Sequence, residues 1–565
     1  MGFGLRFLIV IFSIFLIGCN FSSGKDTEII SLPQGDIVGF AKGDTDYFLG
    51  IPYADPPIGT NRFEPPKSHK GWSDVLEAKE AEKQCMQPQG EEGELSEFFE
   101  VFLTKSGMKR WEQIILENAA WLFASLDFEK QQSEDCLFIN IIKPSKIDKG
   151  SLPVMVWFHG GGYNFGNGDG LYITDRFAKR DVILVTMNYR LGPFGFFAHP
   201  LLSETSKMGV SGNYGTLDQI AALKWVKDNI ASFGGNPNNV TIFGESAGGQ
   251  AVTSLMISPL SKGLFHKAIG QSGARLLPLT HLNKSTTYSK SAEDLSLEWS
   301  KVMTASNNSS LEALKKIPPL TIIRNLENDP LYSTQFDSLT VIDGNVIPED
   351  ISQIFQKGEQ ADVPVLIGST ADEATPLDPK MLSPQLESMS YKRLTHLAIA
   401  DILPEADSSI YELYPVDTEQ IAKKSWVDFT TDVMFTAQMQ KWGDLMSNVE
   451  SPAYLYLWNW HPSINGSKEY RAFHAAEVPY IFGNFDVFNI DLSERDRKFS
   501  QVMMEIWTSF AKNGIPSIDT DEWPEFESNY QKYVLLDENI EVKQGLRAEK
   551  VTLINEAYDR VRDDF

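Results

Sequence analysis

Short apolar runs that end in turn residues recur along the chain and indicate strands. Residues 182–185 are apolar without alternation, which is expected of a strand that is covered on both of its faces. Residues 153–158 form a similar run that leads directly into a cluster of glycines, and residues 362–370 and 453–460 indicate two further strands. Together these runs predict a sheet that is buried on both faces.

The segment before the strand at 240–243 has the period of a helix. Its apolar residues recur at helical spacing and the pattern stops at Gly234 and Gly235. These apolar positions are Leu217, Ile220, Leu223, Val226 and Ile230. A strand, a helix and a strand in succession predict an α/β fold class with a large, mostly parallel sheet covered by helices. No linker rich in proline, glycine or serine divides residues 29–565, so we expect one α/β domain with helical insertions.

The strand after this helix carries a serine between two glycines. Residues 240–243, VTIF, suit a strand, and glycine favours a sharp turn. The small residues that follow can begin a helix. The pattern therefore predicts a strand, a sharp turn with Ser246 at its apex, and a helix, which is the layout of a nucleophile elbow, G-x-S-x-G. The alternative is that Ser246 lies in a tight turn that has no catalytic role. The catalytic interpretation therefore requires that other segments of the chain carry the remaining parts of a serine hydrolase.

The N-terminus has the pattern of an export signal. Arg6 precedes an apolar stretch at 7–17, which is short for a bilayer span but suits a signal peptide over 1–18. The stretch ends in LIGC, which resembles a bacterial lipobox with Cys19 as the lipid-carrying residue, and residues 19–28 would then be a polar tether. We expect an exported protein that is anchored in the bacterial cell envelope by this lipid alone. The alternative is a secreted soluble protein with an ordinary signal.

Composition and charge narrow the functional class. The chain has 565 residues, of which 42% are hydrophobic, enough for a large core. Its formal net charge of −26 argues against nucleic-acid binding, because phosphate binding needs clustered positive charge. If Cys19 is lipidated, Cys85 and Cys136 remain, and in an exported protein they are most simply a disulfide. No C-x-x-C or histidine-rich spacing suggests a metal site.

A glycine-rich segment follows the predicted strand at 153–158. A serine nucleophile needs a base to take its proton and donors for the oxyanion that forms on the acyl carbon. Residues 159–166, HGGGYNFG, would let backbone N–H groups approach a ligand, and an HGGG loop has this position in lipases and esterases. A plain glycine-rich turn is the alternative. A nucleotide site is disfavoured because neither G-x-G-x-x-G nor G-K-[ST] is present.

Several long motifs together resemble those of one family. Residues 233–248, FGGNPNNVTIFGESAG, are similar to the serine signature of the type B carboxylesterase/cholinesterase-like family of α/β-hydrolases. Residues 134–144, EDCLFINIIKP, resemble its second signature, and flanking motifs such as GIPYADPPIGTNRFEPP and LFHKAIGQSG stand in the family's order. The resemblance extends over residues 30–560 and implies an α/β-hydrolase fold and an ester hydrolase that needs no cofactor.

The resemblance also implies a catalytic set. Ser246 would be the nucleophile, and His474, in RAFHAAEVPYIFG, would be the base. Glu373, in GSTADEA, would be the acid, with Asp372 as its local competitor. The order serine, glutamate, histidine agrees with that of α/β-hydrolases. His461 also follows the strand at 453–460, but only His474 lies in the matching motif.

The same motifs imply supporting roles and a reaction. The N–H groups of Gly161, Gly162 and Ala247 would form the oxyanion hole, and Glu245 and Ser272 would brace the carboxylate and the histidine. The expected protein is a serine carboxylesterase that hydrolyses small-molecule carboxylic esters through an acyl-enzyme. One alternative is a lipase-like enzyme that acts on long-chain esters. Another is a non-catalytic adhesion protein of the same family, which the presence of every catalytic part weighs against.

The region between the two cysteines departs from the family's pattern. Cholinesterases have a tryptophan near the second cysteine that binds the choline cation, and no tryptophan stands at the matching place before Cys136. Specificity for quaternary ammonium esters is therefore doubtful. The loop from Cys85 to Cys136 is also longer than the family's usual loop. Its residues 90–128 are rich in helix formers and aromatic residues, so the loop is either extra packing on the body or a cap that favours bulky apolar or aromatic esters.

Overall fold

The computed structural model describes most of the chain. The described residues are 24–81, 83–88, 132–147, 150–287, 289–304, 310–328, 340–382, 386–463, 470–485, 492–518 and 521–562. The predicted signal peptide, the lipidation site at Cys19 and the segment 90–128 lie outside them. In the part of the chain that is described, no helix combines the length and the apolar character that crossing a membrane would require.

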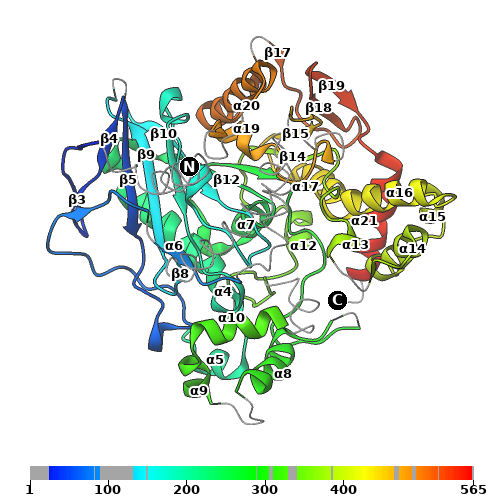
Figure 1. Ribbon diagram of the computed structural model, residues 1–565, viewed down its shortest axis with the longest axis horizontal. Helices are drawn as coiled ribbons and strands as arrows, with labels where there is room; N and C mark the ends of the chain where they lie inside the picture. The colour runs from blue at the N-terminus through cyan, green and yellow to red at the C-terminus, as the bar shows by residue number, and fades with distance from the viewer. Residues whose placement is uncertain are drawn as a thin grey trace, which may run out of the picture.

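A twelve-stranded sheet runs through the described part of the molecule (Figure 1). From one edge to the other its strands are β1 (Lys25–Asp26), β4 (Phe40–Lys42), β5 (Thr45–Pro52), β9 (Phe138–Pro144), β11 (Ile183–Met187), β10 (Leu152–Phe158), β12 (Gly235–Glu245), β13 (Lys267–Gln271), β14 (Val365–Thr370), β15 (Ala453–Trp458), β18 (Lys532–Leu536) and β19 (Glu541–Gln544). Smaller sheets join β2 (Ile30–Leu32), β3 (Gly35–Val38) and β6 (Leu76–Glu77), then β7 (Gln84–Cys85) with β8 (Gln132–Ser133), and β16 (Ser517–Ile518) with β17 (Asp521–Glu522).

The centre and the edges of the large sheet differ in strand direction. Within the run from β11 to β18, adjacent strands are parallel to one another, whereas all pairings of β1, β4, β5, β9 and β19 in this sheet are antiparallel. The predicted parallel sheet is therefore its central part, where helical crossovers return the chain to the same edge. Lys25 and Asp26, which we expected in the polar tether, pair with β4 at the sheet edge. The open N–H and C=O groups of an edge strand accept such a short partner.

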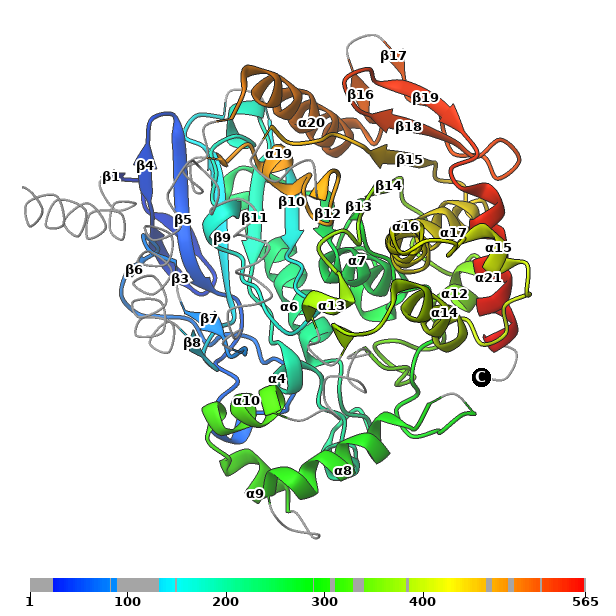
Figure 2. The ribbon, with the colours of Figure 1, turned by 45° about the vertical axis from the view of Figure 1, so that its right-hand side comes forward.

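Helices cover both faces of the sheet, as a buried parallel sheet requires (Figure 2). One layer contains α6 (Tyr214–Asn229), α7 (Ala247–Ile257), α12 (Ile351–Gln356) and α17 (Ala437–Met446), and the other contains α19 (Val478–Phe482) and α20 (Glu494–Asn513). On β12, Ile242 belongs to the first core and Phe243 to the second, and neither side chain is exposed. Burying each such side chain contributes about 1.5–3 kcal/mol.

The other helices gather mainly in two groups. Near one end of the molecule lie α5 (Pro200–Thr205), α8 (Ala292–Thr304), α9 (Leu311–Lys316) and α10 (Pro319–Asn328) (Figure 1). The second group contains α13 (Pro379–Leu382), α14 (Tyr391–Ile402), α15 (Ile410–Leu413), α16 (Glu419–Thr431) and α21 (Ala548–Arg562), in which α14 packs on α16 and α21 packs on α17, while α4 (Gly192–Phe196) follows β11. These are the helical insertions that the sequence predicts between the strands.

The boundaries around β12 differ in detail from those expected. The helix α6 ends at Asn229 and a short 3₁₀ turn, η4 (Ile230–Phe233), completes the segment before Gly234. The strand β12 then begins at Gly235, five residues before the apolar run at Val240. β10 pairs with Gly235 and then, after an irregularity in register, with Val240–Gly244, so the polar residues 236–239 bulge out of the pairing with β10. The carboxyl ends of β10, β12, β14 and β15 lie at one edge of the sheet, where the candidate residues meet.

Candidate active site

Ser246 lies at the apex of a tight strand-to-helix turn. It follows β12, precedes α7 and has φ 55° and ψ −123°, a conformation that is strained for a residue with a side chain. The turn is held because the N–H of Ser246 donates to the Gln271 carbonyl at 2.9 Å. A Cβ atom on Gly248 would lie 2.0 Å from the Phe158 carbonyl oxygen, and one on Gly273 would lie 2.0 Å from that of Ser246. Glycine is therefore sterically required at positions 248 and 273.

The glycine loop after β10 lies against this turn. A Cβ atom on Gly160 would stand 3.2 Å from the Ser246 Cβ. Gly161 and Gly162 both have positive φ, of 100° and 57°. Across the described residues, the N–H groups of Gly161, Gly162 and Ala247 donate to no partner. Three N–H groups without an internal partner near a serine hydroxyl can serve an oxyanion.

His159 supports this loop rather than the chemistry. Its ring stacks on Tyr189 with centroids 4.3 Å apart, and its Nδ1 lies 2.8 Å from the Gly160 carbonyl oxygen. The Tyr189 hydroxyl donates to the His159 carbonyl at 2.7 Å. Burial lowers the pKa of His159 to about 4, so this ring is neutral at physiological pH. It therefore fixes the direction in which the following glycines run.

His474 and Glu373 form a close pair. The Nδ1 atom of His474 lies 2.6 Å from Oε2 of Glu373, and the His474 N–H donates to the Glu373 carbonyl at 3.2 Å. The other oxygen, Oε1, accepts from the Thr370 N–H at 2.7 Å. Asp372, the competing acid, instead pairs with Arg471 at 2.7 Å. The geometry thus favours Glu373 as the partner of the histidine.

Three buried carboxylates surround this histidine. Oε1 of Glu245 lies 3.2 Å from His474 Nε2, and the side chains of Glu373 and Glu477 are also buried. Burial opposes a charge on His474, but the carboxylates of Glu245 and Glu373 outweigh it and raise the pKa of His474 to about 9. Burial raises the pKa of Glu245 to about 8. The site is therefore built to stabilise an imidazolium.

The nucleophile and the base are not yet hydrogen-bonded. In the described part of the chain, no hydrogen bond joins Ser246 Oγ to His474 Nε2, which faces Glu245 instead. Such bonds are often long in enzymes without substrate and tighten when the reacting complex forms. Ser272, expected as a brace, is buried at the end of β13, and its hydroxyl contacts no hydrogen-bond partner among the described residues. Its N–H donates to the Gly368 carbonyl of β14 at 2.8 Å, so the observed hydrogen bond of Ser272 joins two strands and does not brace the histidine or its acid.

Glu477 is a site residue that the sequence reasoning missed. Its Oε1 accepts from Gln271 Nε2 at 3.2 Å, and Gln271 Oε1 accepts from Trp507 Nε1 at 3.0 Å. Burial and the charge of Glu373 raise the pKa of Glu477 to about 7. Its position three residues after His474, within the matched motif, is the signal that could have found it.

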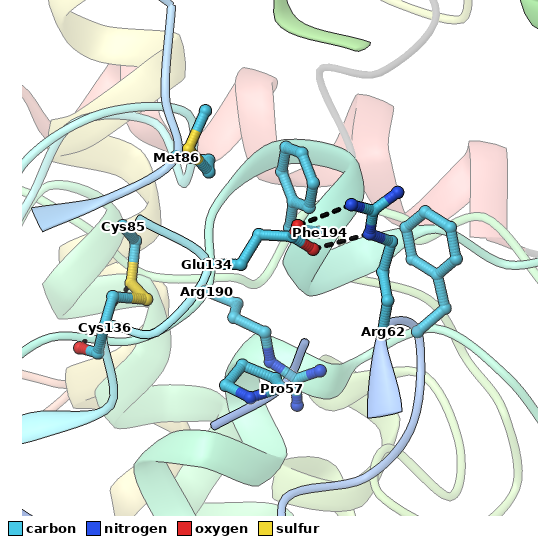
Figure 3. A pocket seen from close by; sticks show the side chains of 9 residues that line it. Pro57, Arg62, Cys85, Met86, Glu134, Cys136, Arg190 and Phe194 are labelled. Atoms are coloured by element: carbon cyan, nitrogen blue, oxygen red, sulfur yellow. Dashed lines mark hydrogen bonds and ion pairs between the residues drawn. A yellow bond between two sulfur atoms is a disulfide. The ribbon is translucent and has the colours of Figure 1, made fainter. Parts of the chain in front are cut away.

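The predicted disulfide is present and lies near the glycine loop. Cys85 and Cys136 are bonded, with a sequence separation of 51 residues. Figure 3 shows this disulfide and the buried ion pair of Arg62 and Glu134 around one small cavity. Gln87, two residues after Cys85, donates to the Gly166 carbonyl and accepts from the Gly166 N–H at 2.8 Å. The long loop therefore begins beside the glycine loop of the site.

The fold and this site define an α/β-hydrolase of the serine type. The model of the carboxylesterase family matches residues 26–554, and the chain belongs to that family. It is therefore a carboxylic ester hydrolase, and the fold class, family and activity predicted from the sequence are confirmed.

Characterised proteins of similar sequence are esterases. The chain is 32% identical to a para-nitrobenzyl esterase of Bacillus subtilis (strain 168), over 93% of this chain and 97% of that protein. It is 31% identical to a fumonisin B1 esterase of Sphingopyxis macrogoltabida, over 89% of this chain and 85% of that protein. It is 32% identical to liver carboxylesterase 1 of Oryctolagus cuniculus, over 92% of this chain and 90% of that protein.

Solved structures of esterases share the fold. A PNB esterase superposes with a TM-score of 0.73 at 30% identity, covering 93% of this chain and 99% of that one. A carboxylesterase of Geobacillus stearothermophilus superposes with a TM-score of 0.75 at 27% identity, with the same coverage.

Proposed function

We propose that the chain hydrolyses carboxylic esters with Ser246 as nucleophile, His474 as general base and Glu373 as the acid that orients the base. His474 takes the proton of Ser246 Oγ while this oxygen bonds to the ester carbonyl carbon. The imidazolium then gives that proton to the leaving alcohol, which leaves an acyl group on Ser246. Water repeats the two steps, releasing the carboxylic acid and restoring the serine. The 2.6 Å contact of His474 with Glu373 is the observation that carries this proposal.

The oxyanion of each tetrahedral intermediate rests on the N–H groups of Gly161, Gly162 and Ala247. Support comes from their lack of internal partners among the described residues and from the closeness of the glycine loop to Ser246. Because these donors belong to the backbone, they are oriented before substrate binds and need no reorganisation. Glu245 and Glu477 complete the site by favouring the positive charge that His474 acquires in each step.

The substrates are small neutral esters with a bulky apolar or aromatic group. The Glu373 carboxylate balances the charge of the His474 imidazolium, so this buried pair carries no net positive charge that would attract an anionic ester. The relatives named above include a para-nitrobenzyl esterase and a fumonisin B1 esterase. The loop between the cysteines begins beside Gly166 of the glycine loop, and its residues 90–128, expected as either packing or a cap, lie outside the described part.

The protein works outside the cytoplasm. We base this on the signal pattern at 1–18 and the lipobox that ends at Cys19, and the Cys85–Cys136 disulfide supports an oxidising compartment. A membrane-bound enzyme that is released when Cys19 is replaced by serine would agree with the lipid anchor. Release of the wild-type protein into the medium would favour the secreted alternative.

The test is hydrolysis of p-nitrophenyl esters of graded acyl length and of aromatic acids. Ser246→Ala should lose nearly all turnover, and the same loss should follow from His474→Ala and from the double variant, because the two residues act as a unit. Ser447→Ala, a change of an exposed serine distant from the site, is the matched control and should keep full activity. Full turnover in Ser246→Ala would overturn the mechanism. A preference for emulsified long-chain esters would favour the lipase-like alternative.

A further inference from the structure

An irregular helical turn lies beside the catalytic base. Between α16 and α17 the chain forms the π-helical turn η7 (Asp432–Thr436). Such turns are rare, because each inserts an extra residue into a helix, and they occur frequently at functional sites. All but one of the side chains in η7 are buried; Met434 is the exposed one. The position of this turn therefore calls for an explanation.

The turn is anchored from one side by an ion pair whose carboxylate is buried. Asp432 is fully buried, and its two oxygens accept from Arg547 Nη1 at 2.5 Å and from the Tyr414 hydroxyl at 2.8 Å. Arg547 Nη2 also donates to the Ala371 carbonyl at 3.0 Å. One guanidinium thus joins η7 to the loop that carries Glu373.

A second contact ties the other flank of the same loop. The hydroxyl of Thr431, the residue before η7, accepts from the Ala374 N–H at 3.2 Å. Ala371 and Ala374 stand on either side of Glu373. The segment that surrounds η7 therefore holds the loop of the acid at two points, of which the contact of Thr431 with Ala374 is buried and that of Arg547 with Ala371 is partly buried.

The turn also contacts the base itself. The Phe435 side chain is 7% exposed, and its ring centroid lies 4.7 Å from that of the His474 ring, with 38° between the planes. The charged groups that face this imidazole are the carboxylates of Glu373, Glu245 and Glu477. The face of an aromatic ring at this distance attracts a cation, and the effect grows when water is excluded.

We propose that η7 is a positioning element for the catalytic base, in which Phe435 confines the His474 ring and stabilises its cation while the Asp432–Arg547 pair holds Phe435 in place. The inference rests on the proposed role of His474 as general base. Phe435 does not touch the reacting atoms, so it acts only through the imidazole. Its removal should therefore change the titration of the base, an effect that loss of simple packing does not produce.

The experiment measures kcat/KM against pH for Phe435→Leu, for Phe435→Tyr and for the wild type. In Phe435→Leu, the acid limb of the pH profile, where kcat/KM falls as pH is lowered, should move down by about half a pH unit. The plateau of kcat/KM should fall about three- to tenfold. Both effects are expected because the imidazolium loses its aromatic partner. Phe435→Tyr, which keeps the ring, should restore both values to those of the wild type. The KM should change less than kcat, because the lost contact matters most once His474 is charged.

Phe355→Leu is the matched control. Phe355 is a fully buried phenylalanine on α12 whose ring contacts Trp442, so this variant loses packing without touching His474. It should melt at a lower temperature and keep the acid limb of the wild type. If Phe435→Leu does not accumulate as folded protein, Phe435→Met, which keeps an apolar side chain, is measured in the same way.

The outcomes separate the two proposals. An unmoved acid limb in a folded Phe435 variant, or an equal shift in Phe355→Leu, would overturn the role of η7. Turnover that survives in Ser246→Ala or His474→Ala would instead overturn the mechanism on which the inference rests. A shifted limb in Phe435→Leu, together with inactive Ser246→Ala, supports both.

Discussion

Ser246 and His474 reach the same site by different structural routes. Ser246 belongs to one continuous stretch, from β12 through the turn to α7, and the backbone alone sets its position. His474 lies in a loop far along the chain, and its place depends on side chains from other segments: Glu373 after β14, Glu245 at the end of β12, and Phe435 in η7. Backbone sterics therefore fix the position of Ser246, whereas side-chain contacts fix the position of His474.

This difference predicts two kinds of sensitivity. Around Ser246, added atoms collide with backbone that belongs to the central strands, so small changes should have large effects. Around His474, each contact contributes a part of the orientation or charge stabilisation, so single changes should have graded effects. Substitutions on the two sides of the site can test this contrast.

The largest effect is expected from Gly248→Ala on the nucleophile side. The added Cβ would lie 2.0 Å from the Phe158 carbonyl oxygen and 2.8 Å from its carbon, and β10 cannot retreat without disturbing the sheet. We expect destabilisation of about 3 kcal/mol or more and no measurable turnover. Thermal unfolding and ester hydrolysis are the measurements. Gly209→Ala, where the added Cβ meets no atom within 4 Å, should cost about 1 kcal/mol for its positive φ alone. Equal melting temperatures for the two variants would contradict the steric account.

The same contrast explains what the sequence could and could not predict. The elbow at Ser246 and the glycine loop are local, so their spacing alone indicated the turn and the donors. Glu373 and His474 lie in loops that no periodicity marks, and only the family resemblance pointed to them. Phe435 was missed because its contact with His474 exists only in the folded chain, and Glu477 was missed although it lies three residues after His474 in the matched motif.

The fold shows a similar division. The buried parallel strands were predicted from continuous apolar runs, because burial on both faces leaves that pattern in the sequence. The short antiparallel strands β1 and β4 were not, since both residues of β1 are exposed and β4 has one buried residue. The pairing of β1 with β4 depends on backbone groups, which carry no side-chain signal.

An intermediate effect is expected from Glu373→Gln on the base side. The amide can present a donor where the carboxylate accepts from His474 Nδ1, so the imidazole loses its orientation and the partner of its cation. We expect kcat to fall about a thousand- to ten-thousand-fold while the protein stays folded. Asp372→Asn is the matched control at the adjacent residue. Its partner is Arg471, whose side chain is partly exposed, so activity should remain within about threefold of the wild type. Equal losses in both variants would remove the distinction between the two acids.

The smallest effect is expected from Glu245→Gln, which removes one charge near the base and changes little in shape. The neutral imidazole is the active base, so activity is lost as pH falls through the pKa of His474. Because Glu245 and Glu373 raise that pKa to about 9, the wild-type acid limb should lie above the ordinary histidine value of about 6.5. Without the Glu245 charge, the pKa of His474 falls and a larger fraction of the base is neutral at a given pH.

The acid limb of kcat/KM in Glu245→Gln should therefore move down by about one pH unit. The gain should be largest below the wild-type limb, and the alkaline plateau should fall modestly, because the imidazolium of the transition state is stabilised less. Glu349→Gln, which removes an exposed carboxylate paired with Lys357, should leave the limb in place. A limb that stays fixed or moves up in Glu245→Gln would show that this carboxylate does not act on the base. The position of His474 would then depend on Glu373 and Phe435, and the contrast with Ser246 would rest on those two contacts.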